Sequence, residues 1–340
     1  MNSLFTDILK GNYGNRPAVW YMRQAGRVLP AYQELRQSYT FAQLMADAQL
    51  AAQVTMMPVA DLDVDAAIVF SDILTVPVAM GMQLEWTEHG PQFTTPLSAY
   101  NNPLQHLCPN YSHFSATCKA LSIASAMQQV PVIGFCGAPL TTLCYMLQGN
   151  SAKHDFPDAK RYFITHRSQT VQLINAITEV SIAYARQQIA SGASAFQLFE
   201  THAGIVPADE YATFFLPSVE RIAQAVRECG VPFIFFPKGI GTGLSLITPD
   251  VCDYVSIDWQ TPLSVARQIV HHSVGLQGNI DPMLLFAPQE MMIKVMEEKY
   301  KPFFRHNKNW IINLGHGVLA NTPIENLRYL TRWIKQTEWS

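Results

Sequence analysis

Short apolar, strand-like runs recur eight times along the sequence, and most are followed by a segment with helical patterning. The runs are Ala18–Met22, Ala66–Phe70, Pro131–Phe135, Ala195–Phe199, Pro232–Phe236, Tyr254–Ile257, Val274–Leu276 and Trp310–Ile312. The helical segments are Thr40–Met56, Phe114–Met127, Ala159–Ser191, Pro207–Cys229, Pro262–His271, Pro288–Lys299 and Pro323–Lys335. Continuous apolar strands that alternate with helices indicate a parallel sheet covered on both faces. Eight such units in 340 residues predict a (β/α)8 TIM barrel.

A doubly wound open sheet is the structural alternative. Its glycine-rich G-x-G-x-x-G fingerprint does not follow the first strand. Gly239, Gly241 and Gly243 form a glycine-rich turn after the fifth strand, but no lysine followed by serine or threonine comes next, so we expect a tight strand-to-helix loop there. No linker, repeat or low-complexity segment divides residues 1–340, which predicts a single domain.

One long excursion, from about Leu84 to Pro109, interrupts the alternation after the second strand. The segment Trp86–Phe93 within it has the pattern of a small β-hairpin, with the turn expected at Gly90-Pro91.

The composition restricts the classes of partner. Hydrophobic residues make up 49% of the chain and charged residues 14%, which is enough to bury a large core. A net charge of −3 gives no basic excess for nucleic acid, so anion binding must come from a local arginine cluster. No window has the roughly 20 apolar residues of a membrane span. Six scattered cysteines behind an N-terminus without a secretory pattern predict reduced thiols in a cytoplasmic protein.

Arginines gather directly after the first strand. Arg23 and Arg27 are four residues apart, Gly26 lies between them, and Arg36 follows one segment later. Guanidinium groups match carboxylate or phosphate in bidentate fashion, and a glycine lets the backbone approach a ligand closely. The segment therefore predicts a polyanion site. The alternative is a surface loop whose arginines are merely solvated.

Polar side chains or glycines follow every predicted strand. In chain order they are Arg23 and Arg27; Ser71-Asp72; Cys136-Gly137-Ala138-Pro139, with Tyr145 beyond; Glu200-Thr201-His202; Lys238-Gly239; Asp258-Trp259; Gln277-Gly278-Asn279, with Asp281; and Asn313-Leu314-Gly315-His316-Gly317. A (β/α)8 barrel carries its active site at the C-terminal ends of its strands, so these groups are the candidates for function.

Five of these segments, taken in order, resemble the uroporphyrinogen decarboxylase family, and the resemblance extends over nearly the whole chain. They are Val19-Trp20 to Arg27 with Leu29-Pro30, Phe70-Ser71-Asp72-Ile73-Leu74, Gly134-Phe135-Cys136-Gly137-Ala138-Pro139, Leu276-Gln277-Gly278-Asn279-Ile280-Asp281-Pro282, and Asn313-Leu314-Gly315-His316-Gly317. The resemblance implies a cofactor-free, metal-free enzyme of tetrapyrrole synthesis, a single-domain barrel and a homodimer. It also implies that uroporphyrinogen is the substrate, and that its four acetate groups become methyls to give coproporphyrinogen.

The resemblance also assigns roles to residues. Arg23, Arg27 and Arg36 would bind substrate carboxylates, as would the backbone of Gln24, Ala25 and Gly26. Asp72 would accept hydrogen bonds from the pyrrole N–H groups. It must be ionised to stabilise a cationic pyrrole, and we expect nearby arginines to favour that form.

Other positions complete the predicted site. Tyr145, Thr201 and His316 would hydrogen-bond the substrate, and Phe41 and Phe199 would supply an apolar wall. The predicted catalytic residues are Asp72, Arg23, Tyr145 and His316. We favour Arg23 assisted by water as the proton donor; because a guanidinium is a poor acid, a carboxyl or a relayed hydronium is the alternative.

Structural interpretations compete with these roles. Asp72 could cap a helix that begins at Ile73, Tyr145 could be a core aromatic, and His316 could be a loop histidine bonded to backbone. Asp258 and Asp281 could be residues that only orient loops, so neither is placed in the site. Two features depart from the family pattern: Leu140, where a large aromatic is expected, and the loop after Lys238. Thr201 stands where some members of the family have serine, which keeps the hydroxyl.

Two other functions compete with the decarboxylase. The first is a zinc-dependent, corrinoid-linked methyltransferase of the same superfamily, which needs thiolate and imidazole ligands around an open zinc site. The one His-x-Cys pair, His106-Leu107-Cys108, lies in the excursion and not at a strand end. The second is a non-catalytic tetrapyrrole-binding barrel, which would lack the acid and donor groups that this chain retains.

Overall fold

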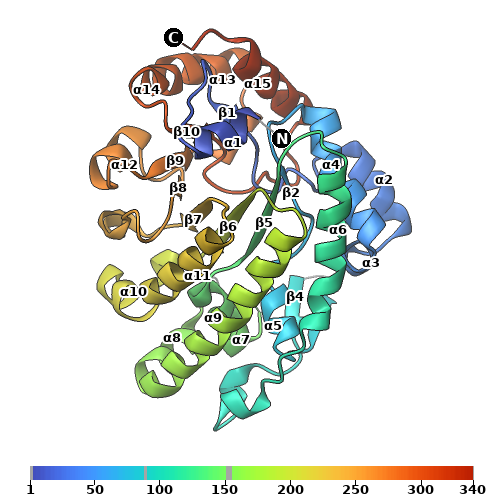
Figure 1. The fold of residues 1–340 in the computed structure, drawn as a ribbon, viewed down its shortest axis with the longest axis vertical. Helices are drawn as coiled ribbons and strands as arrows, with labels where there is room; N and C mark the ends of the chain where they lie inside the picture. Colours follow the sequence, from blue (N-terminus) through green and yellow to red (C-terminus); the bar gives the residue numbers. More distant parts are fainter. Residues whose placement is uncertain (1–2, 88–89, 151–154, 340) are drawn as a thin grey trace.

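An eight-stranded parallel sheet forms the centre of the molecule in the computed structural model, which describes residues 3–87, 90–150 and 155–339 (Figure 1). In chain order the strands are β1 (Ala18–Val19), β2 (Ala67–Ile68), β5 (Val132–Gly137), β6 (Ala195–Glu200), β7 (Phe233–Pro237), β8 (Tyr254–Ile257), β9 (Gly275–Gly278) and β10 (Trp310–Ile312). Their order in the sheet is β1-β10-β9-β8-β7-β6-β5-β2. Each of the eight predicted runs contributes one strand, and the (β/α)8 fold is confirmed.

Helices surround the sheet (Figure 1). The α-helices are α1 (Leu4–Leu9), α2 (Pro30–Ser38), α3 (Phe41–Ala46), α4 (Ala48–Leu62), α5 (Thr75–Ala79), α6 (Ser115–Ala126), α7 (Pro139–Gln148), α8 (Pro157–Thr165), α9 (Arg167–Ala190), α10 (Ala208–Phe214), α11 (Leu216–Glu228), α12 (Leu263–Ile269), α13 (Gln289–Val295), α14 (Lys301–His306) and α15 (Ile324–Gln336). Shorter turns are η1 (Leu97–Ala99), η2 (Pro103–His106), η3 (Tyr111–Phe114), η4 (Ala203–Ile205), η5 (Gly241–Leu246), η6 (Pro282–Phe286) and the π-helical η7 (Met296–Tyr300). No helix in the described part of the chain is both long enough and apolar enough to cross a membrane.

Several predicted helices are divided. The segment predicted as Thr40–Met56 contains α3 and α4, because the Asp47 carboxylate accepts the N–H groups of Gln49 and Leu50 and starts a new helix. The segment Ala159–Ser191 contains α8 and α9, and Pro207–Cys229 contains α10 and α11. Pro288–Lys299 is α13 followed by η7. All four segments are therefore helical as predicted, and each consists of two helices.

The β1–β2 seam closes through side chains more than through strand pairing. The Asp65 N–H donates to the Val19 carbonyl oxygen, and its carboxylate accepts the Val19 N–H, both at 2.8 Å. Asp65 is itself paired with Arg16 at 2.7 Å. The buried Gln24 amide accepts the Tyr21 N–H at 2.9 Å and donates to the Ala66 carbonyl oxygen at 3.0 Å. These bonds join the two outermost strands of the sheet and fix the loop that begins at residue 23.

The β-hairpin excursion is present, but its predicted turn is wrong. Strands β3 (Leu84–Thr87) and β4 (Gly90–Phe93) pair antiparallel, with Trp86 opposite Pro91 and Thr87 opposite Gly90. Gly90 and Pro91 therefore belong to the second strand, and the two connecting residues, 88–89, lie outside the described residues. The Thr87 hydroxyl donates to the Gly90 carbonyl oxygen at 2.8 Å, which holds the two strands together beside the connection.

Candidate active site

The loop after β1 brings Arg23 to the mouth of the barrel, meaning the C-terminal ends of its strands. Arg23 has a left-handed backbone with φ of 60°, a conformation that is uncommon for a residue other than glycine. Its side chain crosses the β10 loop so closely that a Cβ atom on Gly317 would lie 2.3 Å from Arg23 Cδ. Gly317 therefore has to be a glycine for the arginine to occupy this position.

Backbone N–H groups beside Arg23 are open to a ligand. The Gln24 N–H donates to the Tyr21 carbonyl oxygen at 3.0 Å, so this predicted carboxylate contact is already engaged. Ala25, Gly26 and Arg27 have N–H groups with no acceptor among the described residues. Three successive open donors next to two guanidiniums form a concave site suited to an anion.

Asp72 lies four residues beyond the end of β2, with one of its two carboxylate oxygens engaged. Oδ1 accepts the Leu74 N–H at 2.8 Å, and no donor in the described ranges meets Oδ2. Burial raises the pKa of Asp72 above its ordinary value, while the Leu74 N–H and the charge of Arg23 oppose that rise. Arg23 thus favours the ionised form as expected, but burial is the larger effect, so arginine charge does not set the pKa.

The alternative of a helix cap holds only in part. Helix α5 begins at Thr75 and its N-cap is Leu74, so Asp72 is not the cap of a helix that starts at Ile73. The Asp72 carbonyl oxygen accepts from the Thr75 N–H at 3.2 Å and from its hydroxyl at 2.8 Å. Asp72 therefore shapes this turn and keeps one oxygen for another partner.

His316 is held neutral next to Arg23. Its Nδ1 accepts the Gly317 N–H at 2.5 Å, which leaves Nε2 as the protonated nitrogen and a hydrogen-bond donor. Burial and the neighbouring charges of Arg23 and Lys238 lower the pKa of His316 to about 3. At neutral pH the ring can donate one hydrogen bond to a substrate oxygen but carries no charge.

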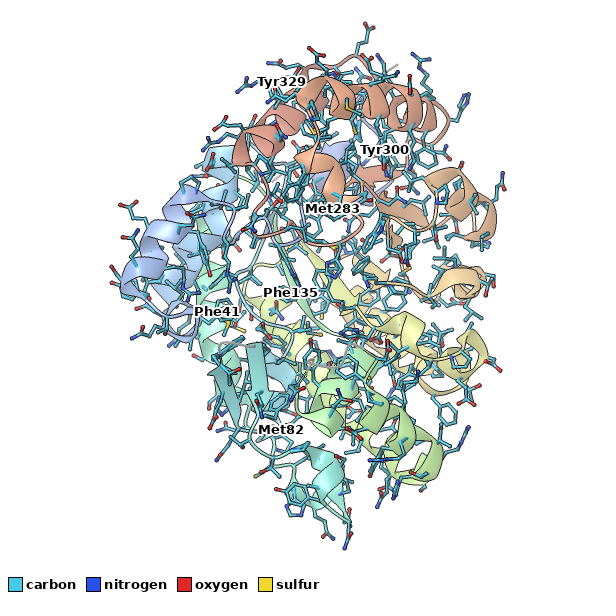
Figure 2. All side chains as sticks on the ribbon, turned by 180° about the vertical axis from the view of Figure 1, so that it is seen from behind. Phe41, Met82, Phe135, Met283, Tyr300 and Tyr329 are labelled. Carbon is cyan, nitrogen blue, oxygen red and sulfur yellow. The ribbon has the colours of Figure 1, made fainter. Side chains whose placement is uncertain are left out.

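Aromatic rings connect His316 to the opposite strands. The Phe236 ring lies 6.2 Å from His316 and 6.1 Å from Phe199, and Phe199 lies 5.4 Å from Phe135. Figure 2 shows Phe135 near the centre of the molecule. Phe199, predicted as apolar wall, is thus part of a continuous aromatic surface from β5 to the β10 loop.

Tyr145 and the β6 loop adjoin this surface. Tyr145 is a half-buried residue of α7, and its ring lies 6.0 Å from His202, whose charge also lowers the pKa of His316. Thr201 is half-buried between Glu200 and His202. Both predicted residues are therefore located beside the mouth, after the neighbouring strands β5 and β6.

The remaining predicted residues lie further out. Arg27 is exposed, and Arg36 donates to the Tyr39 carbonyl oxygen at the end of α2. Phe41, at one side of the molecule in Figure 2, packs 5.4 Å from Phe70 and 4.6 Å from Trp86 of the hairpin. Phe41 is thereby linked to the strand end that carries Asp72, whereas none of the contacts of Arg36 reaches the mouth.

Glu200 is a fully buried acid at the end of β6 that was not included in the predicted site. Its two oxygens accept from the N–H groups of Thr141 (2.6 Å) and Leu140 (3.2 Å), at the start of α7, and from the Tyr211 hydroxyl (3.1 Å). Burial raises its pKa to about 7. Since the Thr141 hydroxyl accepts the His202 N–H at 3.1 Å, Glu200 and Thr141 together fix α7 against the β6 loop.

Asp258 and Asp281 both hold loops. Asp258 accepts the N–H groups of Gly239 (2.6 Å) and Gln260 (2.9 Å), and Asp281 accepts the Met283 N–H (2.9 Å). The loop after Lys238 is tight, as expected, with a positive φ at Gly239 and at Gly241, the first residue of η5. Leu140 is fully buried in the core, so its side chain is not exposed at the mouth.

A cavity of about 980 Å³ opens beside Asp72. Its walls come from the start of α4, from α5, from the hairpin and from the start of α6, and they include Asp72 but not Arg23, Tyr145 or His316. Asp72 therefore lies between this cavity and the mouth.

Within the described ranges, no group of three or more His, Cys, Asp or Glu side chains could hold a metal ion. His106, one member of the His-x-Cys pair, stacks on Tyr100 with ring centroids 3.6 Å apart.

Comparison with known proteins shows the family of this chain. Residues 1–337 match the family described as Uroporphyrinogen decarboxylase (URO-D). The uroporphyrinogen decarboxylase of Pelobacter propionicus is 37% identical over 99% of both chains, and that of Geobacter metallireducens is 36% identical over 98% of both. A solved methyltransferase from Methanosarcina mazei matches 99% of both chains with a TM-score of 0.76, but at 17% identity this likeness shows the fold alone. The chain belongs to the uroporphyrinogen decarboxylase family.

Proposed function

We propose that this chain removes the carboxyl groups of the four acetate side chains of uroporphyrinogen III, which leaves methyls and gives coproporphyrinogen III. Family membership supports this activity. The observation that carries it is the proximity at the mouth of Arg23 to two groups: the half-buried Asp72, which keeps an open oxygen, and the neutral His316. An anion faces the reaction centre and cationic groups surround it.

The proposed chemistry uses the pyrrole ring as its own electron sink. A proton adds to the α-carbon beside an acetate, and the ring becomes a cation. The bond to the carboxylate then breaks, carbon dioxide leaves, and its electron pair neutralises the ring. The new exocyclic methylene gains a proton to become methyl, and the α-carbon loses the proton it took up. No organic cofactor or metal is needed in this cycle.

Asp72 supplies the electrostatic stabilisation in this proposal. Its open oxygen accepts the pyrrole N–H groups and lies opposite the ring cation, in a half-buried place where a fixed charge acts more strongly than in bulk water. Arg23, assisted by water, is the proposed proton donor. Tyr145, Thr201 and His316 donate hydrogen bonds to the substrate.

Binding of the carboxylates is assigned to the β1 loop. Arg23 and Arg27 have no acidic partner within 4.0 Å among the described residues, and the N–H groups of residues 25–27 are open. Arg36 joins this set only if α2 turns its guanidinium away from Tyr39. Phe41 and Phe199 form apolar wall.

We further propose that residues 1–340 form one domain, that the enzyme works in the cytoplasm and that it is a homodimer. Analytical ultracentrifugation of the purified chain measures the last point directly. A mass of twice 38.1 kDa is expected, and a monomer at micromolar concentration would contradict it.

An anaerobic assay tests the activity. Chelator-treated, dialysed protein receives uroporphyrinogen I or III, and products are separated by chromatography while carbon dioxide is measured. We expect coproporphyrinogen and up to four carbon dioxide molecules per substrate, at an undiminished rate. Activity that disappears on chelation and returns with zinc would favour the methyltransferase alternative. Binding of substrate without carbon dioxide release would favour the non-catalytic barrel.

A further inference from the structure

Lys238 is a half-buried cation at the mouth with no role in the site described above. It follows β7 directly, and its backbone is held on both sides: its N–H donates to the Glu200 carbonyl oxygen at 3.0 Å, and its own carbonyl oxygen accepts the Gly204 N–H at 3.2 Å. Its Nζ atom lies 5.6 Å from the centre of the Trp259 ring. The ammonium is thus held in one region of the mouth.

No carboxylate oxygen among the described residues lies within 4.0 Å of this ammonium. The neighbouring acid, Asp258, accepts backbone N–H groups with both of its oxygens, from Gly239 and Gln260. Lys335, in contrast, has Asp63 at 2.7 Å. A cation that is partly removed from water and has no acidic side chain beside it costs folding free energy, unless a ligand supplies the negative charge.

The groups that surround Lys238 do not supply negative charge. The Trp259 ring lies 6.3 Å from His316, and His316 is neutral at physiological pH. Arg23 and Lys238 both act on His316, which places two cations around this one imidazole. The positive charges of Arg23 and Lys238 at the mouth are therefore not fully balanced by acidic side chains nearby.

The sheet order places these cations on opposite sides. In the order β1-β10-β9-β8-β7-β6-β5-β2, strand β7 is four positions from β1, which is halfway round a ring of eight. Arg23 and Arg27 follow β1, and Lys238 follows β7. A macrocycle with carboxylates around its whole rim would meet arginines at one edge and the lysine at the other.

We propose that Lys238 binds a carboxylate of the substrate on the side of the mouth opposite Arg23 and Arg27, so that the tetrapyrrole is held from both edges. This inference rests on the proposed function for the identity of the ligand. It predicts that Lys238 contributes to binding and not to the chemical step, because Lys238 follows β7 and Asp72 follows β2, three positions away in the sheet.

Lys308 offers a matched control. It is also half-buried, and its Nζ lies 3.9 Å from the centre of the Phe304 ring, but it precedes β10 and so lies at the opposite end of the barrel. Replacing Lys308 by methionine removes the same charge and the same type of ring contact. If the loss of a lysine charge and its ring contact affects stability or net charge in general, the effect should appear in both Lys238→Met and Lys308→Met.

The experiment compares Lys238→Met, Lys238→Arg and Lys308→Met. Lys238→Met is expected to raise KM for uroporphyrinogen about tenfold, because this is the usual effect of losing one partly screened, charge-assisted hydrogen bond. The value of kcat should change less than threefold. The dependence of KM on salt should weaken. Lys238→Arg and Lys308→Met should stay within threefold of wild type. A KM within twofold of wild type for Lys238→Met, with the same salt dependence, would overturn the proposal.

Direct binding separates this inference from the proposed function. The affinity of each variant for uroporphyrinogen is measured anaerobically through tryptophan fluorescence. If wild type binds the substrate but does not decarboxylate it, the proposed function is wrong, and a tenfold loss of affinity in Lys238→Met alone still supports the lysine contact. Equal affinity of wild type and Lys238→Met would remove Lys238 from the binding site whatever the activity.

Discussion

Asp72 and Glu200 are both carboxyls at the mouth of the barrel, and burial raises the pKa of both, although Glu200 is fully buried and Asp72 is half-buried. Their hydrogen bonds differ. Glu200 accepts from two backbone N–H groups and a tyrosine hydroxyl, so both of its oxygens are engaged. Asp72 accepts from one backbone N–H through Oδ1 alone, and Arg23 lies near it.

The difference separates two uses of an acid at a barrel mouth. An acid whose oxygens are all engaged stabilises the fold, because its removal leaves buried donors without an acceptor. An acid that keeps an open oxygen retains an electrostatic effect that a substrate can use. We therefore expect Asp72 to control the rate and Glu200 to control stability.

The largest expected effect is on the rate of the Asp72→Asn variant. The amide keeps the shape of the side chain but removes the anion, so kcat should fall about 10²–10³-fold, the usual cost of losing one preorganised electrostatic partner. Steady-state assays measure this fall, and thermal unfolding should change little.

Asp281→Asn is the matched control for this change. Asp281 also follows a strand and also accepts the N–H of the residue two positions later, at 2.9 Å. Its kcat should remain within threefold of wild type. An Asp72→Asn variant that turns over within threefold of wild type would show that the open oxygen has no catalytic role.

Glu200→Gln tests the other half of the comparison through stability. Each oxygen of Glu200 faces a backbone N–H, so an amide nitrogen in either orientation meets another donor. We expect unfolding free energy at neutral pH to fall by about 1–3 kcal/mol. Glu210→Gln, which breaks an exposed ion pair to Arg167, should cost less than about 1 kcal/mol.

The pH dependence of stability sharpens this test. The pKa of Glu200 rises from 4.5 to about 7 on folding, so the folded chain binds more protons between these pH values. The contribution of this carboxyl to stability is therefore full below about pH 4.5 and is lost as the pH rises to about 7, by about 3 kcal/mol in total. Denaturant titrations should show this loss in wild type and not in Glu200→Gln. If the unfolding free energy depends on pH equally in the two proteins, the raised pKa of the buried Glu200 carboxyl is contradicted.

Smaller effects are expected at the arginines. Arg27→Ala should raise KM about tenfold through the loss of a charge-assisted contact, with kcat nearly unchanged. Arg23→Ala should raise KM and also lower kcat, because Arg23 lies near Asp72 and His316. If both substitutions change KM alone, Arg23 binds carboxylate and takes no part in proton transfer.

The sequence predicted the barrel and its mouth well because strand-like runs and strand ends are local patterns. All eight strands were found, whereas the split between α3 and α4 depends on the Asp47 cap, which a helical pattern does not reveal. Helix α7 was missed because it is buried on nearly all sides and so lacks a polar face. The hairpin turn was misplaced because strand register, rather than the Gly-Pro pair, sets it.

The site was less predictable than the fold. The motifs selected Asp72 and Arg23, but the engaged Gln24 N–H and the left-handed backbone of Arg23 depend on contacts with distant segments. Glu200 and Lys238 also stand at strand ends in the sequence. Only the three-dimensional packing shows that Glu200 accepts three hydrogen bonds, whereas Lys238 contacts a tryptophan ring and has no acidic partner among the described residues.

The ratio of kcat between wild type and Asp72→Asn, measured from pH 8 downward, tests the central claim most directly. Ionisation of the substrate affects both proteins and cancels in the ratio. Because burial places the pKa of Asp72 above 3.8, the ratio should be large at high pH and should fall as acid protonates Asp72, with its midpoint above pH 3.8. A ratio near one at every pH, or a large ratio that acid leaves unchanged while the protein remains folded, would contradict an ionised Asp72 as the electrostatic partner of the reaction.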